Sequence, residues 1–173
     1  MNNLAVILSH CDTSEKVDIL RKLIKRLKNL GIDTLLCSHI PLEISIQQDV
    51  AYYIYDTDNP VLHWPENAVY KWEKPTGPTG PALHAIFPDY GWAAMDQIKK
   101  ACNFALTLGY EFYSFINYDV MLTPELDSYI LTAFTLNHPV VCTKSHDFPI
   151  TTLFTIVKKD ALEEISTRIN KND

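Results

Sequence analysis

The chain alternates short apolar runs with longer amphipathic segments, and this alternation restricts its fold more than any other feature. Residues 4–9 (LAVILS) and 33–38 (DTLLCS) are short, largely apolar runs that are typical of strands in a buried sheet. Between them, residues 17–30 place apolar side chains at helical spacing, with lysine and arginine mostly on the other face. A strand, a helix and a strand in this order predict a right-handed crossover and a sheet that is at least partly parallel. The predicted fold class is therefore α/β.

The same alternation continues along the rest of the chain. We expect further strands at 51–56, 110–116, 139–143 and 151–159, and further helices at 91–108, 124–136 and 160–169. Thr13 or Ser14 is expected to cap the first helix and Gly31 to end it. Asp160 is the expected N-cap of the last helix, and Glu163 would complete a capping box there.

The length of the chain predicts one domain. At 173 residues, residues 1–173 are expected to form a single unit with an irregular loop at about 61–91. That loop is rich in proline, contains Trp64 and Trp72, and repeats the sequence TGPTGP. Tryptophan is unusual in a disordered linker, so we expect the loop to fold over part of the domain. Core packing is the favoured role of its aromatic side chains, and ligand contact is the alternative.

Charge and cysteine content restrict the expected partners and the expected cellular compartment. The net charge of −6 and the lack of a basic run disfavour a nucleic-acid partner. The four cysteines are widely spaced without a CxxC pair, which disfavours a zinc site and suits free thiols in a reducing compartment. The amino terminus does not have the pattern of a signal peptide, and no stretch approaches the roughly 18 apolar residues of a membrane span. We therefore expect a cytoplasmic protein without a membrane span.

Polar residues stand at the ends of two predicted strands. The aromatic strand at 110–116 is followed by Asn117-Tyr118-Asp119, and the strand at 51–56 ends in the acidic turn Asp56-Thr57-Asp58. A carboxylate at the carboxyl end of a parallel strand lies where open α/β sheets bind ligands, and it can hold a divalent cation. The alternative is that these residues only form turns, which both residue types favour.

Three segments carry a resemblance to a known family. They are LAVILSHCD, YYIYDTDNP and GYEFYSFINYDVMLTPEL. Together they resemble the nucleotide-sugar-binding part of a GT-A glycosyltransferase, in particular the large inverting family 2. The third segment is the most specific, because its glycine, its Asn-x-Asp and its Thr-Pro-Glu fall at the offsets of the family pattern GADYVLLLNPDVRLSPDL. The resemblance covers most of residues 4–160 and implies a three-layer, Rossmann-like GT-A fold with a mainly parallel central sheet.

The resemblance also implies roles for individual residues. Ser9 and His10 would lie beside the nucleotide of a nucleotide-diphospho-sugar donor, and Asp56 and Asp58 would hold its base or ribose. Asp119 would bind a divalent cation, Mn²⁺ or Mg²⁺, that stabilises the departing diphosphate. Asn117 would also contact the nucleotide donor. It stands where the family most often has a second aspartate, and an amide is a weaker ligand for a hard cation than a carboxylate, so metal binding would rest mainly on Asp119. The neighbouring Lys99-Lys100 pair is expected to be solvated and not to neutralise phosphate.

The residue that would complete the reaction is not evident. An inverting transferase needs a carboxylate to deprotonate the acceptor hydroxyl, and in the family this base follows the unit that TTLFTIVKKDALEEI resembles. The chain shows no evident counterpart of that section. Asp147 is the best local substitute and His146 the second, although a plain turn is the more common explanation of such a sequence.

Three functional hypotheses follow. The first is a metal-assisted glycosyltransferase that transfers a sugar from a nucleotide-diphosphate donor to a saccharide or other hydroxyl acceptor, with an acceptor site built from the 61–91 loop. The second is a nucleotide-sugar-binding domain without transfer activity, which the lack of an evident base favours. The third is an α/β interaction module that binds a partner through its aromatic loop. Acidic residues at both strand ends disfavour the third hypothesis.

Overall fold

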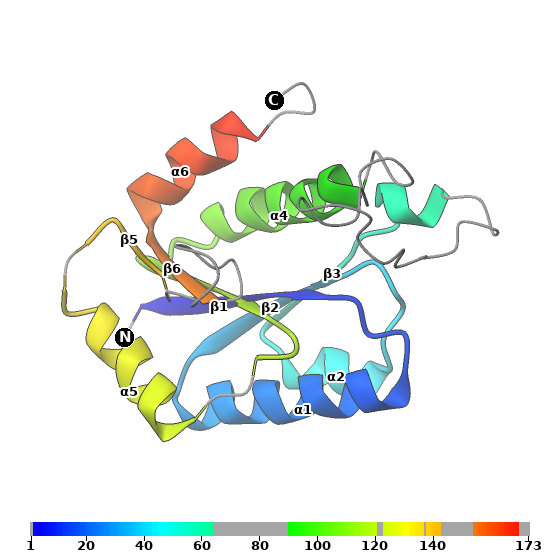
Figure 1. Ribbon diagram of the computed structural model, residues 1–173, viewed down its shortest axis with the longest axis horizontal. Coiled ribbons are helices and arrows are strands. Elements are labelled where there is room, and N and C mark those ends of the chain that lie inside the picture. The colour runs from blue at the N-terminus through cyan, green and yellow to red at the C-terminus, as the bar shows by residue number, and fades with distance from the viewer. Residues whose placement is uncertain (1, 64–89, 121–122, 137, 143–153, 170–173) are drawn as a thin grey trace, which may run out of the picture.

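A mixed six-stranded sheet forms the centre of the described part of the chain (Figure 1). The computed structural model describes residues 2–63, 90–120, 123–136, 138–142 and 154–169. Its strands are β1 (Asn3–Ser9), β2 (Asp33–Ser38), β3 (Tyr52–Tyr55), β4 (Phe112–Asn117), β5 (Val140–Cys142) and β6 (Phe154–Lys158). Its helices are α1 (Ser14–Asn29), α2 (Ile44–Asp49), the 3₁₀ turn η1 (Pro60–His63), α4 (Tyr90–Leu106), α5 (Pro124–Ala133) and α6 (Lys159–Arg168).

The order of the strands places four carboxyl ends along one edge of the sheet. The strands are arranged β3-β2-β1-β4-β6-β5, and β3, β2, β1 and β4 are parallel to their neighbours. Strand β6 runs antiparallel to both β4 and β5. In the register of the central strands, Ser9 of β1 lies beside Ser38 of β2, and Leu8 lies beside Asn117 of β4. The polar residues that follow these strands therefore meet at one edge.

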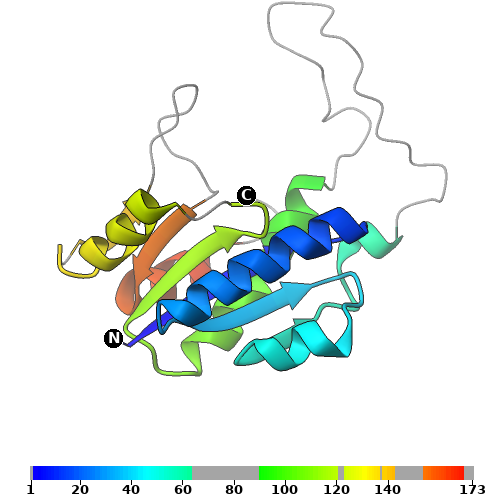
Figure 2. The same ribbon diagram turned by 90° about the horizontal axis from the view of Figure 1, so that it is seen from below.

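Helices cover both faces of the sheet, which gives three layers. Alternate residues of β1 belong to two different cores: Ala5 and Ile7 pack with α1, α2 and α5, whereas Leu4 and Val6 pack with α4 and α6. Figure 1 shows α1 and α2 on one side of the strands and α4 and α6 on the other, and Figure 2 shows α1, in blue, running along the face of the sheet. The predicted three-layer α/β fold with a mainly parallel sheet is confirmed.

The boundaries of the first helix follow the expected signals. The Thr13 side chain accepts a hydrogen bond from the backbone N–H of Lys16 and so caps α1. Gly31 has a φ of 69°, a left-handed conformation in which a side chain would be strained, and it follows the helix as predicted.

One expected detail is wrong, and one helix was not predicted. Helix α2 lies in a region that the sequence pattern left unassigned, because a six-residue helix that buries only Ile46 has almost no periodic signal. Asp160 is not the N-cap of α6, because the helix begins one residue earlier, at Lys159, and Lys158 is the capping residue. The Lys159 backbone N–H donates to the carbonyl of Glu111 at 3.0 Å, which fixes the start of the helix beside β4.

Several predictions fall partly or wholly outside the described residues. The loop expected at 61–91 is described only at its two ends, where Pro60–His63 forms η1 and α4 begins at Tyr90. Residues 64–89, including both tryptophans of that loop, lie outside the description, as do Asp147 and His146. Within the described ranges, no helix combines the length and apolar character needed to cross a bilayer.

Candidate functional site

A pocket of about 500 Å³ opens at the carboxyl ends of β1, β2 and β4. It lies at the point where the chain order reverses, because β1 leads outward to β2 and β3 on one side while β4 lies on the other. Open α/β sheets bind ligands at this position. The residues that line it include Ser9, His10, His39, Gln97, Asn117 and Asp119.

Four of the predicted site residues line this pocket. Ser9 is the last residue of β1, and its buried hydroxyl donates to the Cys11 thiol at 3.2 Å. His10 follows it, and Asn117 ends β4 on the opposite wall. Asp119, two residues further along, is exposed and lines the same pocket. The structure therefore brings the ends of the first and third motif segments together.

The acidic turn after β3 is arranged differently. Asp58 is exposed and is not one of the lining residues. The Asp56 side chain is only 2% exposed, and its two oxygens accept hydrogen bonds from Lys100 Nζ at 2.6 Å and from Asn59 Nδ2 at 3.0 Å. Asn59 lines the pocket and also donates to the carbonyl of Ala93 at 3.1 Å. Asp56 thus lies behind the pocket wall and holds Asn59 in it.

The expectation that Lys99 and Lys100 are solvated is wrong. Lys100 bonds Asp56 and also Asp96, at 2.7 Å. Burial alone would lower the pKa of Lys100, but the bonds to these two carboxylates outweigh it and raise the pKa. Lys99 Nζ donates to the carbonyl of Ile169 at 2.8 Å. Helix α4 packs against β1 and β2 on one side and against α6 on the other. This packing places Lys100 beside Asp56 and Lys99 beside the carbonyl that follows α6.

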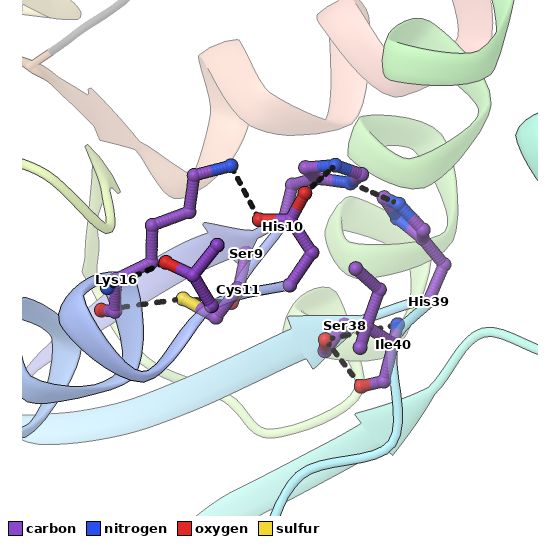
Figure 3. A network of polar contacts seen from close by, with 9 residues as sticks. Ser9, His10, Cys11, Lys16, Ser38, His39 and Ile40 are labelled. Atoms are coloured by element: carbon purple, nitrogen blue, oxygen red, sulfur yellow. Dashed lines mark hydrogen bonds and ion pairs between the residues drawn. The ribbon is translucent and has the colours of Figure 1, made fainter.

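A second polar group of the pocket was not predicted. His10 Nδ1 lies 2.7 Å from His39 Nε2, and His10 Nε2 lies 3.5 Å from a carboxylate oxygen of Asp12 (Figure 3). Asp12 also accepts from Lys16 Nζ at 2.5 Å. The sequence did contain a signal for the histidine pair, because β1 and β2 both end in Ser-His and lie in register at their serines.

Comparisons with known proteins found distant similarity to solved structures. No family model matches the chain, and no curated protein matches it. A solved structure from Desulfovibrio desulfuricans G20, assigned as a nucleotide-diphospho-sugar transferase, is 10% identical with a TM-score of 0.48 over 92% of this chain and 64% of its own. A glycosyltransferase involved in glycosylation of the major capsid of PBCV-1 is 17% identical with a TM-score of 0.42 over 95% of this chain and 63% of its own.

The chain spans less than two thirds of the length of either solved structure. At these identities and TM-scores, neither likeness assigns an activity, a donor or an acceptor to this chain.

The donor set of the pocket can hold a divalent cation only together with a ligand. Among the described residues, no group of three or more histidine, cysteine, aspartate or glutamate side chains is placed to bind a metal. Asp119 offers a carboxylate and Asn117 an amide oxygen from the same strand end. A hard cation such as Mg²⁺ takes about six oxygen ligands and often completes them with waters and substrate phosphates. These residues therefore fit a cation that a bound diphosphate also coordinates.

Acidification should destabilise the fold through the two pocket histidines. Burial is the largest cause that lowers the pKa of His10 and of His39 below the ordinary 6.5. As the pH falls below 6.5, the unfolded chain binds protons that the folded chain resists, so the free energy of unfolding decreases. We expect the thermal midpoint to fall across this range, and to fall less in the double variant His10→Asn/His39→Gln. Equal slopes in the two proteins would contradict this account.

Proposed function

We propose that this chain binds a nucleotide-diphospho-sugar in the pocket at the ends of β1, β2 and β4 and acts as a metal-assisted glycosyltransferase. The observation that carries the proposal is the position of Asp119, exposed in that pocket at the topological switch point. Asn117, Ser9 and His10 line the same pocket. A carboxylate and an amide at one wall and polar side chains at the other suit a ligand with a charged diphosphate and a hydrogen-bonding nucleoside.

Each residue is given a distinct task in this proposal. Asp119 would hold a divalent cation, Mn²⁺ or Mg²⁺, which would supply Lewis-acid stabilisation of the departing diphosphate, and Asn117 beside it would contact the nucleotide donor. Ser9 and His10 would contact the nucleotide from the end of β1. Asp58, in the exposed turn after β3 and outside the pocket lining, would reach only a part of the base or ribose that extends beyond the pocket. Asp56 acts from behind by fixing the amide of Asn59. Such fixed positions supply orientation and no bond chemistry.

The acceptor and its base belong to the same proposal. The proposed acceptor is a saccharide or another molecule with a hydroxyl group, whose oxygen serves as the nucleophile. Asp147, the predicted base, lies outside the described residues. It stays a prediction.

Binding without transfer is the second candidate, and one observation favours it. The carboxylates that line the described part of the pocket are Asp12 and Asp119. Asp12 already accepts from Lys16, and Asp119 is assigned to the cation, so neither is available to deprotonate an acceptor. A donor site can therefore be present without a complete catalytic centre.

Calorimetric titration with a panel of UDP-, GDP- and TDP-sugars, with and without Mn²⁺, tests the proposal. We expect at least one donor to bind in a Mn²⁺-dependent way, and Asp119→Ala to weaken that binding by about tenfold or more, which is about 1.4 kcal/mol. Asp160→Ala, an exposed aspartate in α6, is the matched control and should bind as the wild type does.

Two outcomes would separate the candidates. If no nucleotide-sugar binds, or if Asp119→Ala binds as tightly as the wild type, the proposed donor site is wrong. Chromatography of the bound donor after incubation with candidate acceptors then distinguishes transfer from binding alone, because only a transferase consumes the donor.

A further inference from the structure

The His10–His39 pair joins the ends of two parallel strands inside the pocket. Its two ring nitrogens are 2.7 Å apart, and the ring centroids are 4.9 Å apart. His39 is 7% exposed, and its Nδ1 is buried without a hydrogen-bond partner among the described residues. The His10 side chain is 43% exposed and so can be reached by a ligand. One member of the pair is therefore accessible, and the other is buried behind it.

Counting protons identifies where the pair can accept one more. Two neutral imidazoles carry one N–H each, and one of these lies between His10 and His39. If His39 Nε2 is the donor, the N–H of His10 is on Nε2 and points toward Asp12, at 3.5 Å. The opposite arrangement would turn a lone pair of His10 toward that carboxylate, which is unfavourable. The favoured arrangement leaves His39 Nδ1 as a lone pair, so an added proton binds there.

Most charged side chains around the His10–His39 pair are carboxylates or lysines already paired with carboxylates. A phosphate group in the pocket would therefore have few cationic partners. The carboxylates of Asp12 and Asp119 line the pocket. The negative charge of Asp56, which follows β3, acts to raise the pKa of His39. On α4, Lys100 is paired with Asp56 and Asp96, and Gln97 adds a neutral amide to the wall. Beside β4, the phenol of Tyr118 also lines the pocket.

Lys16 is the cationic side chain among the described residues that line the pocket, and it is bonded to Asp12. It lies in the first turn of α1, whose N-terminus begins at Ser14 beside the pocket. Helix N-termini attract anions through their free N–H groups and the helix dipole. Asp12 thus accepts from two donors, His10 and Lys16, that an anionic ligand could also use.

We propose that the His10–His39 pair is a phosphate-binding group of the pocket, and that it takes up one proton from solvent when a phosphate-bearing ligand enters. The proton binds the lone pair of His39 Nδ1, and the existing N–H bonds of both rings remain in place. The phosphate oxygens accept from His10 Nε2 in place of Asp12, and from Lys16 Nζ, whose three N–H groups can serve Asp12 and the phosphate together. Burial lowers the pKa of each ring and so favours its neutral form before a ligand binds. This inference rests on the proposed function, since it names how the same pocket holds the donor diphosphate.

Proton NMR titration of the histidine ring hydrogens tests the inference on the whole chain, with inorganic sulfate as the probe. Sulfate carries two negative charges and does not titrate near neutrality, so it reports on the protein alone. We expect the pKa of the pair to rise by about half a unit or more in sulfate relative to sodium chloride of equal ionic strength, which corresponds to about threefold tighter sulfate binding by the protonated pair. His39→Gln keeps a donor at the position of Nε2 but cannot take up the proton, and it should abolish the rise. His138→Gln, at an exposed position before β5, is the matched control.

The wild-type spectrum keeps the test decisive even if a variant does not fold. Equal pKa values of the pair in sulfate and chloride would overturn the inference, and a rise confined to the pair would support it. A second measurement uses UDP-glucose, whose diphosphate diester also does not titrate near neutrality, in buffers of different ionisation enthalpy. Binding without proton uptake would overturn the inference but leave the proposed function standing. A sulfate-induced rise in the pKa of the pair without binding of any nucleotide-sugar would leave the phosphate-binding pair standing but overturn the proposed function.

Discussion

Replacing Lys100 by methionine is expected to lower the free energy of unfolding by about 3 kcal/mol, since it leaves a buried carboxylate without its cation. The Asp56 side chain is 2% exposed, so solvent cannot replace Lys100 Nζ, which bonds it at 2.6 Å. Lys100 itself is 33% exposed, which places the expected loss at the lower end for a broken buried pair. Urea unfolding of the wild type and the variant measures the difference.

Two further variants show whether the loss comes from the unpaired carboxylate. Lys22→Met removes an exposed lysine from α1 and should change stability little. Asp56→Asn combined with Lys100→Met removes both charges while an amide oxygen can still accept from Asn59, so most of the loss should be recovered. If Lys100→Met costs no more than Lys22→Met, the pair does not stabilise the strand end.

Leu36→Ala should be a strongly destabilising truncation near the site, with an expected loss of about 2–5 kcal/mol. Leu36 is 0% exposed in β2 and belongs to the core that includes Leu23 and Leu27 of α1. Removing its branched end leaves a cavity between the central sheet and that helix, which close packing fills only in part. Urea unfolding gives the size of the effect.

Leu136→Ala provides the matched comparison, because Leu136 is 49% exposed. We expect that variant to lie within about 0.5 kcal/mol of the wild type. A small loss for Leu36→Ala would mean that the helical layer on this face contributes little to stability, contrary to the arrangement of the two cores.

The sequence predicted the strands and long helices well because their apolar spacing depends only on neighbouring residues. The runs at 4–9 and 33–38 and the amphipathic stretch at 17–30 correspond to β1, β2 and α1 within a few residues. Helix α2 was missed because its six residues bury a single isoleucine. The antiparallel direction of β6 was not predicted. An apolar run indicates a strand but does not show which strand it pairs with or in which direction.

The site was only partly predictable, for a related reason. Asp119 and His10 each follow a strand that could be recognised, so their arrival at one edge followed from the parallel sheet. The Lys100–Asp56 pair joins residues 44 positions apart and depends on how α4 crosses the strand ends. The contact between His10 and His39 requires the register of β1 against β2, which a repeated Ser-His at two strand ends suggests only when the strands are known to be neighbours.

The hydrogen bond from Asn59 to the Ala93 carbonyl has a consequence for how this chain can change over evolution. It joins two points 34 positions apart, with Asp56 and Lys100 fastening the same two segments nearby. The fold therefore already holds both ends of the intervening segment in place. The entropy of closing a flexible loop grows slowly, by about 0.6 kcal/mol for each doubling of length. Changes in length between these two points should therefore cost the described part of the domain little stability.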